Sequence, residues 1–379
     1  MSYRYANAIV KPGLNTLVAG TPTYTYGLWS WGYNVDGPLG QGNTTYLSSP
    51  KQVGALTNWQ SIAVPTGLNA TFSASIKSDG TLWTWGVNSS GQLGLGNTTS
   101  YSSPKQVGAL TNWSSVSCGG SFTIAIKTDG TIWSWGYNSS GQLGLGNTTS
   151  YSSPKQVGAL TNWSQVACGQ YHSVAVKTDG TLWTWGVNSS GQLGLGNTTS
   201  YSSPVQVGAL TNWSKAFAGN ASTFGVTSVS TLLAFGNNYA GSLGLGNSTN
   251  YSSPKQVGAL TNWSSGYVGY YNTAFVKTDS TLWTWGYNGN GQLGFNNTTN
   301  YSSPKQVGAL TNWKTVSIFQ SLLATKTDGT LWSCGYNIYG QLGLGNTTNN
   351  YYSPQQVGAL TNWSSAAISG GRYVLALQV

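Results

Sequence analysis

Residues 113–157 read WSSVSCGGSFTIAIKTDGTIWSWGYNSSGQLGLGNTTSYSSPKQV, and this stretch decides the fold. An Asp-Gly turn at Thr128-Asp129-Gly130 is of the kind that closes a tight β-hairpin. Helical periodicity is absent throughout the chain, and 52 glycines and 11 prolines among 379 residues oppose helices. The stretch therefore predicts an all-β unit of four short strands, at 115–118, 122–127, 131–135 and 155–157.

The same unit repeats along the chain. The block GALTNW occurs seven times, and its tryptophans are spaced once by 54 residues and otherwise by 50. A proline before this block keeps the same step, and a glycine after the third segment keeps it to within one residue, so three landmarks agree. A period of this length with four strands is typical of a β-propeller, in which each repeat forms one blade. We predict seven four-stranded blades, marked by Trp59, Trp113, Trp163, Trp213, Trp263, Trp313 and Trp363.

The two ends of the chain each supply half a blade. Residues 27–32 correspond to the third strand of a unit, and the chain stops after a second strand at 373–377. Joined, the ends form the seventh blade from two strands of each terminus, which closes the ring and leaves no open edge. The predicted domains are therefore an N-terminal arm or anchor at 1–26 and a propeller at 27–379.

Two motifs resemble a known family. Residues 135–147 are similar to the regulator of chromosome condensation repeat, W-G-x-N-x-x-G-Q-L-G-x-G, and residues 166–175 resemble the other half-signature of that family. The resemblance covers 27–379 and implies a seven-bladed propeller. It also implies several possible roles, because nuclear members exchange guanine nucleotide on a small GTPase and bind chromatin, whereas a secreted bacterial relative inhibits β-lactamase. Since the chain has no basic tail and no Glu, the exchange activity is not carried over to it. The low charge and the many Tyr, Ser, Thr and Asn lead us to expect a bacterial or phage-type member.

The composition argues against catalysis. Charged residues are 6% of the chain, which has one His, six Asp and a net charge of +9. His172 stands at the family's usual His position, where a structural hydrogen bond is expected, and five of the Asp lie in repeated turns. No His, Cys and Asp cluster has metal-ligand spacing, and the three Cys are predicted to be small buried residues. We therefore predict no enzyme activity, no catalytic residue, no metal site and no cofactor.

The repeats differ mainly between their first and second strands. This short segment changes in every unit, and its first copy, around residues 65–69, is four residues longer than the others. In a propeller the seven segments meet around one mouth of the channel, where Tyr, His, Asn and Arg suit adaptable recognition. The variation reflects either a ligand-binding face or drift near a crowded channel. The predicted ligand-binding residues are Tyr171, His172, Tyr270, Tyr271, Asn272, Arg372 and Tyr373.

These features lead to two functional hypotheses. The main one is a non-enzymatic structural or recognition protein of a phage virion or cell surface, such as a tail fibre, spike or capsid-attached propeller. The alternative is a soluble protein-binding regulator or inhibitor, such as a nucleotide-exchange-factor-like propeller. A milder divergence at 337–339 and 349–352 is expected to join an outer patch.

The hypotheses differ in partners and location. In the first, residues 1–26 anchor the chain to other virion proteins, or else pack on their own propeller, and the ring contacts a host glycan or protein. We expect no nucleic-acid partner, no signal peptide and no membrane-spanning segment, and predict a virion or extracellular surface as the location. Five Lys after the repeated Pro either protect blade edges from pairing or attract an anionic surface.

Overall fold

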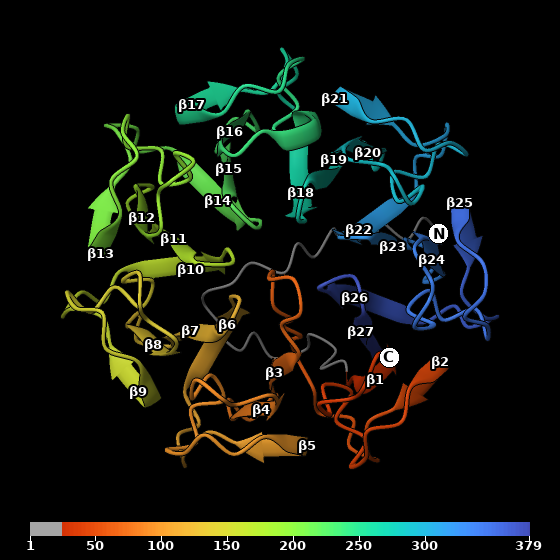
Figure 1. Cartoon of the computed structure of the whole chain (residues 1–379), viewed down its shortest axis with the longest axis horizontal. Helices are drawn as coiled ribbons and strands as arrows, with labels where there is room; N and C mark the ends of the chain where they lie inside the picture. The colour runs from red at the N-terminus through yellow and green to blue at the C-terminus, as the bar shows by residue number, and fades with distance from the viewer. Residues whose placement is uncertain (1–24) are drawn as a thin grey trace, which may run out of the picture.

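Seven sheets surround a central channel (Figure 1). The structure is a computed structural model that describes residues 25–379; the predictions for residues 1–24 lie outside the described part. The innermost strands are β6 (Trp113–Cys118), β10 (Trp163–Cys168), β14 (Trp213–Ala218), β18 (Trp263–Val268), β22 (Trp313–Ile318) and β26 (Trp363–Ser369). The second strands are β3 (Phe72–Ile76), β7 (Phe122–Lys127), β11 (His172–Lys177), β15 (Ser222–Thr227), β19 (Asn272–Lys277), β23 (Ser321–Lys326) and β27 (Tyr373–Gln378).

The outer half of each blade is equally regular. The third strands are β1 (Gly27–Gly32), β4 (Leu82–Gly86), β8 (Ile132–Gly136), β12 (Leu182–Gly186), β16 (Leu232–Gly236), β20 (Leu282–Gly286) and β24 (Leu331–Gly335). The outermost strands are β2 (Leu47–Gln52), β5 (Tyr101–Gln106), β9 (Tyr151–Gln156), β13 (Tyr201–Gln206), β17 (Tyr251–Gln256), β21 (Tyr301–Gln306) and β25 (Tyr351–Gln356). Within residues 25–379, the single helical element is the 3₁₀ turn η1 (Tyr239–Gly241).

The ring is closed as predicted, by strands from both ends of the chain. One sheet has the order β2-β1-β27-β26, and β1 pairs antiparallel with β27 so that Trp31 lies opposite Val374. Because the last inner strands are held by the first outer strands, opening the ring requires breaking this sheet. The predicted seven-bladed, all-β fold is confirmed.

One blade departs from the four-stranded plan. The sheet β3-β4-β5 has three strands, and its innermost position holds only the bridges Trp59–Lys77 and Ala63–Ala74. The longer first copy of the variable segment follows at once, and its Pro65 has no N–H to give to a ladder. The extra residues therefore leave the sheet instead of extending it.

The hydrophobic core lies between blades. Trp135 of β8 is fully buried in a cluster with Phe72 of the preceding blade and Trp113 of its own blade. Its indole N–H donates to the backbone oxygen of Gln92, 2.9 Å away in the preceding blade. Ile132 and Ser134, on the other side of β8, are buried as well. Both faces of the third strand are thus covered by neighbouring blades, as its sequence predicts.

A buried asparagine shapes the long loop after each third strand. The Asn138 side-chain amide donates to the backbone oxygens of Asn147 and Thr149, at 3.0 and 2.9 Å. Its own oxygen accepts from the Leu143 N–H at 2.9 Å. These bonds explain the W-G-x-N part of the repeat, because a buried amide with three partners holds both ends of the loop.

The lysines of the repeated Asp-Gly turns are not simply neutralised by the neighbouring Asp. The Lys127 ammonium lies 3.6 Å from the centroid of the Trp133 ring, while Asp129 accepts from Thr131. In the blade β14–β17 both partners change together, to Thr227 and Leu233. This paired loss is what a cation–π contact predicts, because each group stabilises the other.

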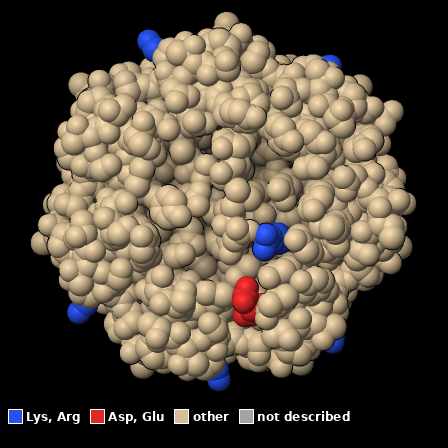
Figure 2. All heavy atoms as spheres, viewed as in Figure 1, with Lys and Arg blue, Asp and Glu red and all other residues tan. Residues whose placement is uncertain are grey.

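The outer lysines are exposed at the perimeter. Figure 2 shows basic groups at the edge of the ring, and a basic group beside an acidic group near the middle of a face that is otherwise uncharged. Lys105 and Lys155 lie on outermost strands, with their ammonium groups 5.3 and 5.4 Å from the rings of Tyr101 and Tyr151. Edge protection and attraction of an anionic surface both stay predictions for these residues.

Candidate functional site

The seven variable segments lie on one side of the ring, here called the variable face. The end of each variable segment is hydrogen-bonded to the residue that follows a third strand. For example, the N–H of Tyr33 donates to Arg372 O at 2.9 Å, and the N–H of Val187 donates to Tyr171 O at 2.9 Å. The start of every long loop therefore shares this face with the variable segments.

Four of the predicted residues are accessible there. Tyr171 is 41% exposed, and its ring lies 6.4 Å from that of Tyr137. The rings of Tyr270 and Tyr271 are 4.1 Å apart, and Tyr239 extends this group at 4.5 Å from Tyr271. The contact with Tyr270 and partial burial raise the pKa of Tyr271 to about 12, so its phenol stays neutral. The fourth accessible residue is Arg372.

Arg372 forms the centre of a second aromatic group, called here the Tyr–Arg patch: Tyr33, Tyr46, Tyr336, Tyr339 and Arg372. The guanidinium carbon lies 5.3 Å from the Tyr33 ring centroid and 5.6 Å from that of Tyr339. Tyr46 packs against both of these rings, at 5.1 and 6.0 Å. Within residues 25–379 the guanidinium has no ion pair and no hydrogen bond. Burial and the charge of nearby Asp36 raise the pKa of Tyr33, whereas Arg372 opposes them, so an acidic side chain lies close to the patch. The patch therefore presents a guanidinium with unpaired donors and a carboxylate in its neighbourhood.

The patch combines residues that the sequence keeps apart. Tyr33 follows β1, Tyr339 follows β24, and Arg372 precedes β27. Sequence reasoning found Arg372 but missed Tyr33 and Tyr46, and placed Tyr339 in an outer patch. The useful signal was that Tyr33, Tyr336 and Tyr339 occupy long-loop positions on the same side as the variable segments.

The other three predicted residues are buried. Tyr373 is completely covered, and its hydroxyl donates to Phe72 O at 2.5 Å. The amide of Asn272, which is 2% exposed, donates to Phe319 O in the next blade. His172 is also fully buried, with Nε2 2.9 Å from Thr223 Oγ1. In the folded ring these side chains hold adjacent blades together beneath the accessible residues.

The His172 imidazole is neutral. The Thr223 hydroxyl donates to Gln192 O at 2.8 Å, so it accepts from the Nε2–H of His172. Nδ1 has no partner and would carry the added proton. Burial lowers the pKa of His172 to about 3, because a buried imidazolium loses its hydration.

This burial predicts a pH dependence of stability. Below the ordinary pKa of 6.5 the unfolded chain binds a proton that the folded chain does not bind, until pH reaches about 3. The free energy of unfolding should therefore fall by about 1.4 kcal/mol per pH unit, or about 2 kcal/mol from pH 6.5 to pH 5. Urea unfolding at several pH values measures it. His172→Phe, chosen because Phe122 occupies the equivalent position in another blade, should flatten the slope; equal slopes would contradict this origin.

The longer variable segment crosses the channel. The Thr66 hydroxyl donates to Cys168 O, 2.9 Å away, two blades along the ring. On the other side, the Ser369 hydroxyl lies 3.1 Å from Pro65 O and 3.2 Å from Ala70 O. Figure 1 shows this loop, before β3, reaching over the middle of the ring. We call residues 64–70 the plug, because they cover the channel at the variable face.

Residues 25–379 contain no group of three or more His, Cys, Asp or Glu that could hold a metal ion. All three Cys are buried and unpaired, as predicted. Nowhere in this range is there a helix with the length and hydrophobicity needed to span a bilayer.

Comparison with known families decides the relationship. The RCC1-like domain matches residues 23–322, and the Regulator of chromosome condensation (RCC1) repeat matches residues 328–377. The chain belongs to the RCC1-like domain family. The resemblance seen in the W-G-x-N-x-x-G-Q-L-G-x-G motif is thereby confirmed at the level of the family.

Curated relatives in this family match only in part. Protein RCC2 homolog of Danio rerio is 43% identical over 72 residues, which are 19% of this chain and 14% of the relative. Protein RCC2 of Homo sapiens is 37% identical over 81 residues, covering 21% of this chain and 15% of the relative. The human E3 ubiquitin-protein ligase HERC2 is 34% identical over 96 residues, but only 2% of its length is matched. The chain thus spans a small part of each.

Two solved structures share the fold of the whole ring. Prp20p from Saccharomyces cerevisiae superposes with a TM-score of 0.83 at 17% identity, covering 94% of this chain and 92% of Prp20p. Human WBSCR16 superposes with a TM-score of 0.80 at 22% identity, covering 93% of this chain and 98% of WBSCR16. At these identities the likeness establishes the fold.

The relatives correct the main functional hypothesis. The prediction of a phage virion or cell-surface protein is wrong, because the matching family is named for a regulator of chromosome condensation and these relatives come from vertebrates and yeast. The predicted virion or extracellular location is wrong for the same reason, and nothing in these matches supports a bacterial or phage-type member. The alternative, a protein-binding regulator, agrees better with the family.

Proposed function

We propose that this chain is a non-enzymatic regulator that binds a partner protein through the variable face, with the Tyr–Arg patch as the anchor. The observation that carries the proposal is the Arg372 guanidinium, which lies against the rings of Tyr33 and Tyr339 and has no ion pair or hydrogen bond within residues 25–379. Tyr171, Tyr270 and Tyr271 extend the contact surface along the same face.

The chemistry of the patch suits a protein interface. Tyr and Arg are enriched at the energetic centres of such interfaces, because they bury a large area with few rotatable bonds and offer directed donors. A guanidinium packed against aromatic rings presents its five donors in one plane, which matches a carboxylate. We therefore expect an Asp or Glu of the partner to lie against Arg372.

The relatives support a protein partner. Prp20p was crystallised in work on its binding to Gsp1p and histones, and yeast RCC1 (Prp20) has been solved in complex with Kap60. This chain has a net charge of +9, which disfavours strongly basic partners such as histones. Gsp1p is accordingly the first partner to test.

The double variant Tyr339→Ala/Arg372→Ala should weaken partner binding at least about 30-fold, because hot-spot residues contribute about 2 kcal/mol or more each. Both side chains are on the surface, so the melting temperature should change little. Binding is measured by calorimetry with purified Gsp1p and by quantitative capture of cellular proteins on the immobilised chain.

The matched control is Lys155→Ala, which removes one positive charge from the exposed edge strand β9. It should bind like the wild type. Equal loss in both variants would indicate a non-specific effect of net charge. Unchanged binding of the double variant to every captured protein would show that the patch is not the anchor.

A further inference from the structure

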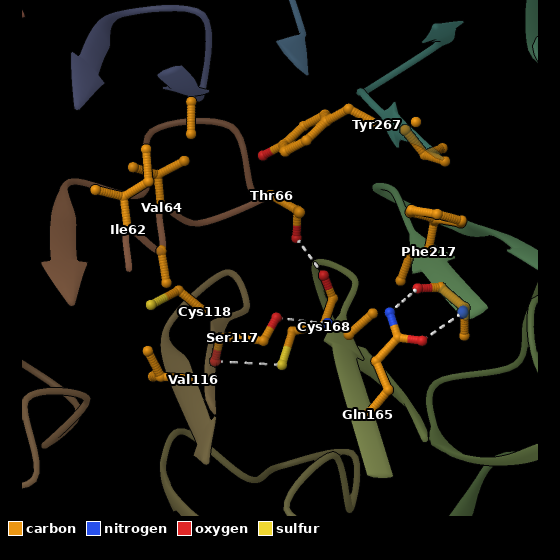
Figure 3. A pocket seen from close by; sticks show the side chains of 17 residues that line it. Ile62, Val64, Thr66, Val116, Ser117, Cys118, Gln165, Cys168, Phe217 and Tyr267 are labelled. Carbon is orange, nitrogen blue, oxygen red and sulfur yellow. Dashed lines mark hydrogen bonds between the residues drawn. The ribbon is translucent and has the colours of Figure 1, made fainter. Parts of the chain in front are cut away.

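The channel contains a cavity of about 200 Å³ below the plug (Figure 3). Its walls come from the inner strands β6, β10, β14 and β18, together with residues 62–66 of the longer variable segment and Ala367 of β26. The plug closes it at the variable face, through the Thr66 hydrogen bond to Cys168 O. The cavity therefore belongs to the ring interior and not to the Tyr–Arg patch.

The channel-facing side chains differ among blades. At the equivalent position, the fourth residue after the inner-strand Trp, β10 and β26 carry Ala167 and Ala367, whereas β14 and β18 carry Phe217 and Tyr267. Ala167 lies in the blade next to that of Phe217, and Ala367 lies farther round the ring, so the small residues leave space beside and across from the aromatic rings. This distribution creates a recess in the channel that identical repeats would not produce.

Most polar groups in the wall are already paired within the protein. The Gln165 amide donates to Ala216 O and accepts from Ala216 N–H, both at 2.9 Å. The Ser117 hydroxyl accepts from the Cys168 N–H at 3.0 Å, and Thr66 is used by the plug. Burial raises the pKa of both Cys118 and Cys168, so each thiol stays protonated and weakly polar. The paired groups leave a predominantly apolar lining.

Tyr267 is the exception. Its phenol oxygen points into the space between Val64 and Thr66 (Figure 3) and accepts from the Ser317 hydroxyl, but the acceptor for its own proton, Ile368 O, is 3.5 Å away, at the limit of a hydrogen bond. A buried phenol normally has a closer partner. Tyr267 can therefore donate to a molecule inside the cavity.

The size and lining favour an organic molecule over water. A water molecule needs two to four polar partners, whereas a dry apolar cavity of about 150 Å³ in another protein binds benzene. Here the donor Tyr267 faces a mainly apolar space of slightly greater volume, whose other polar side chains are already paired.

We infer that the channel is a binding site for a compact, mainly apolar molecule with one hydrogen-bond acceptor, the size of a substituted benzene. The acceptor receives the Tyr267 hydroxyl, and the apolar body packs against Val64, Val116, Ala167 and Phe217. The plug retains the molecule at the variable face. This site is independent of partner binding at the Tyr–Arg patch, so either one stands if the other fails.

The test uses two probes, fluorobenzene and 4-fluoroacetophenone, followed by ¹⁹F NMR with the full chain. Wild type should bind both, and the ketone about five-fold more tightly, which is the effect of one net hydrogen bond. Tyr267→Phe should bind both probes with equal affinity. Absence of binding to wild type, or an undiminished ketone preference in Tyr267→Phe, would overturn the inference.

Two cavity-filling variants complete the test. Ala167→Leu and, from another blade, Ala367→Leu should each lower the affinity for both probes at least about ten-fold, because the larger side chain fills the cavity. The second variant keeps the test decisive if the first does not fold. The matched control is Ala159→Leu in an exposed loop, which should bind like wild type. Unchanged binding in a folded cavity-filling variant would place the probes elsewhere and reject the site.

Discussion

Trp135→Ala should lower the free energy of unfolding by about 3–5 kcal/mol, the range for removal of a large buried aromatic side chain. Trp135 is 0% exposed, and its ring lies 6.0 Å from that of Trp113 in a cluster shared by two blades. The truncation leaves a cavity at the blade interface and removes the indole hydrogen bond to Gln92 O. Urea unfolding followed by fluorescence and by circular dichroism measures the loss.

Trp135→Phe is the matched control. Phe235 occupies the equivalent position in β16 and is also fully buried, so this chain already accommodates the smaller ring in one blade. The Phe variant should lose clearly less stability than the Ala variant, because most of the aromatic area remains. The Gln92 carbonyl still accepts from the Thr123 hydroxyl at 2.8 Å, so no acceptor is orphaned. Equal losses below about 1 kcal/mol would contradict the assigned role of this tryptophan.

Gly136→Ala should lower the free energy of unfolding by about 3 kcal/mol or more, because the added methyl group strains a backbone that is held by the neighbouring strand. Gly136 ends β8 with φ of +100°, and a Cβ there would lie 2.6 Å from Ser121 O and 2.7 Å from Phe122 Cα. Both contacts are with backbone of the neighbouring strand β7 or the residue just before it, so relief requires parting the two strands. Thermal and urea unfolding of the purified variant test this expectation.

Gly158→Ala separates the two causes of that loss. Gly158 also has a positive φ, +61°, but a Cβ there would meet no atom within 4 Å. Gly158→Ala should lower the free energy of unfolding by about 1–2 kcal/mol, which is the penalty of a left-handed backbone conformation alone. If the two variants lost the same stability, close approach of the strands would not be the reason for glycine at the end of the third strand.

Most of the fold could be predicted from the repeats. Strand positions follow from alternation and turn residues within about 50 residues, and the count of blades follows from the number of repeats. The pairing of β1 with β27 followed from the half-units at the two ends. The interrupted inner strand at Trp59–Ala63 was not predicted, because the consequence of four extra residues depends on what they contact outside their own sheet.

The candidate site was predictable only in its general place. The variable segments do share one face, but neighbouring residues within a segment differ in burial. Tyr171, for example, is exposed at the surface, whereas His172 is buried between blades. Both positions vary between repeats, so variation alone does not separate contact residues from packing residues. The deciding factor is the adjacent blade, which covers His172 through Thr223.

The sequence by itself determined a closed, seven-bladed all-β ring with a variable face and few groups for chemistry, because strand alternation, turn residues and repeat number are properties of nearby residues. Only the tertiary structure decided that Arg372 meets Tyr33 and Tyr339, that residues 64–70 cross the channel, and that Tyr267 faces an apolar cavity. These contacts join residues up to about 340 positions apart, since Tyr33 and Arg372 stand at opposite ends of the chain. Closure of the ring brings them together, and no local pattern records which side chains then touch.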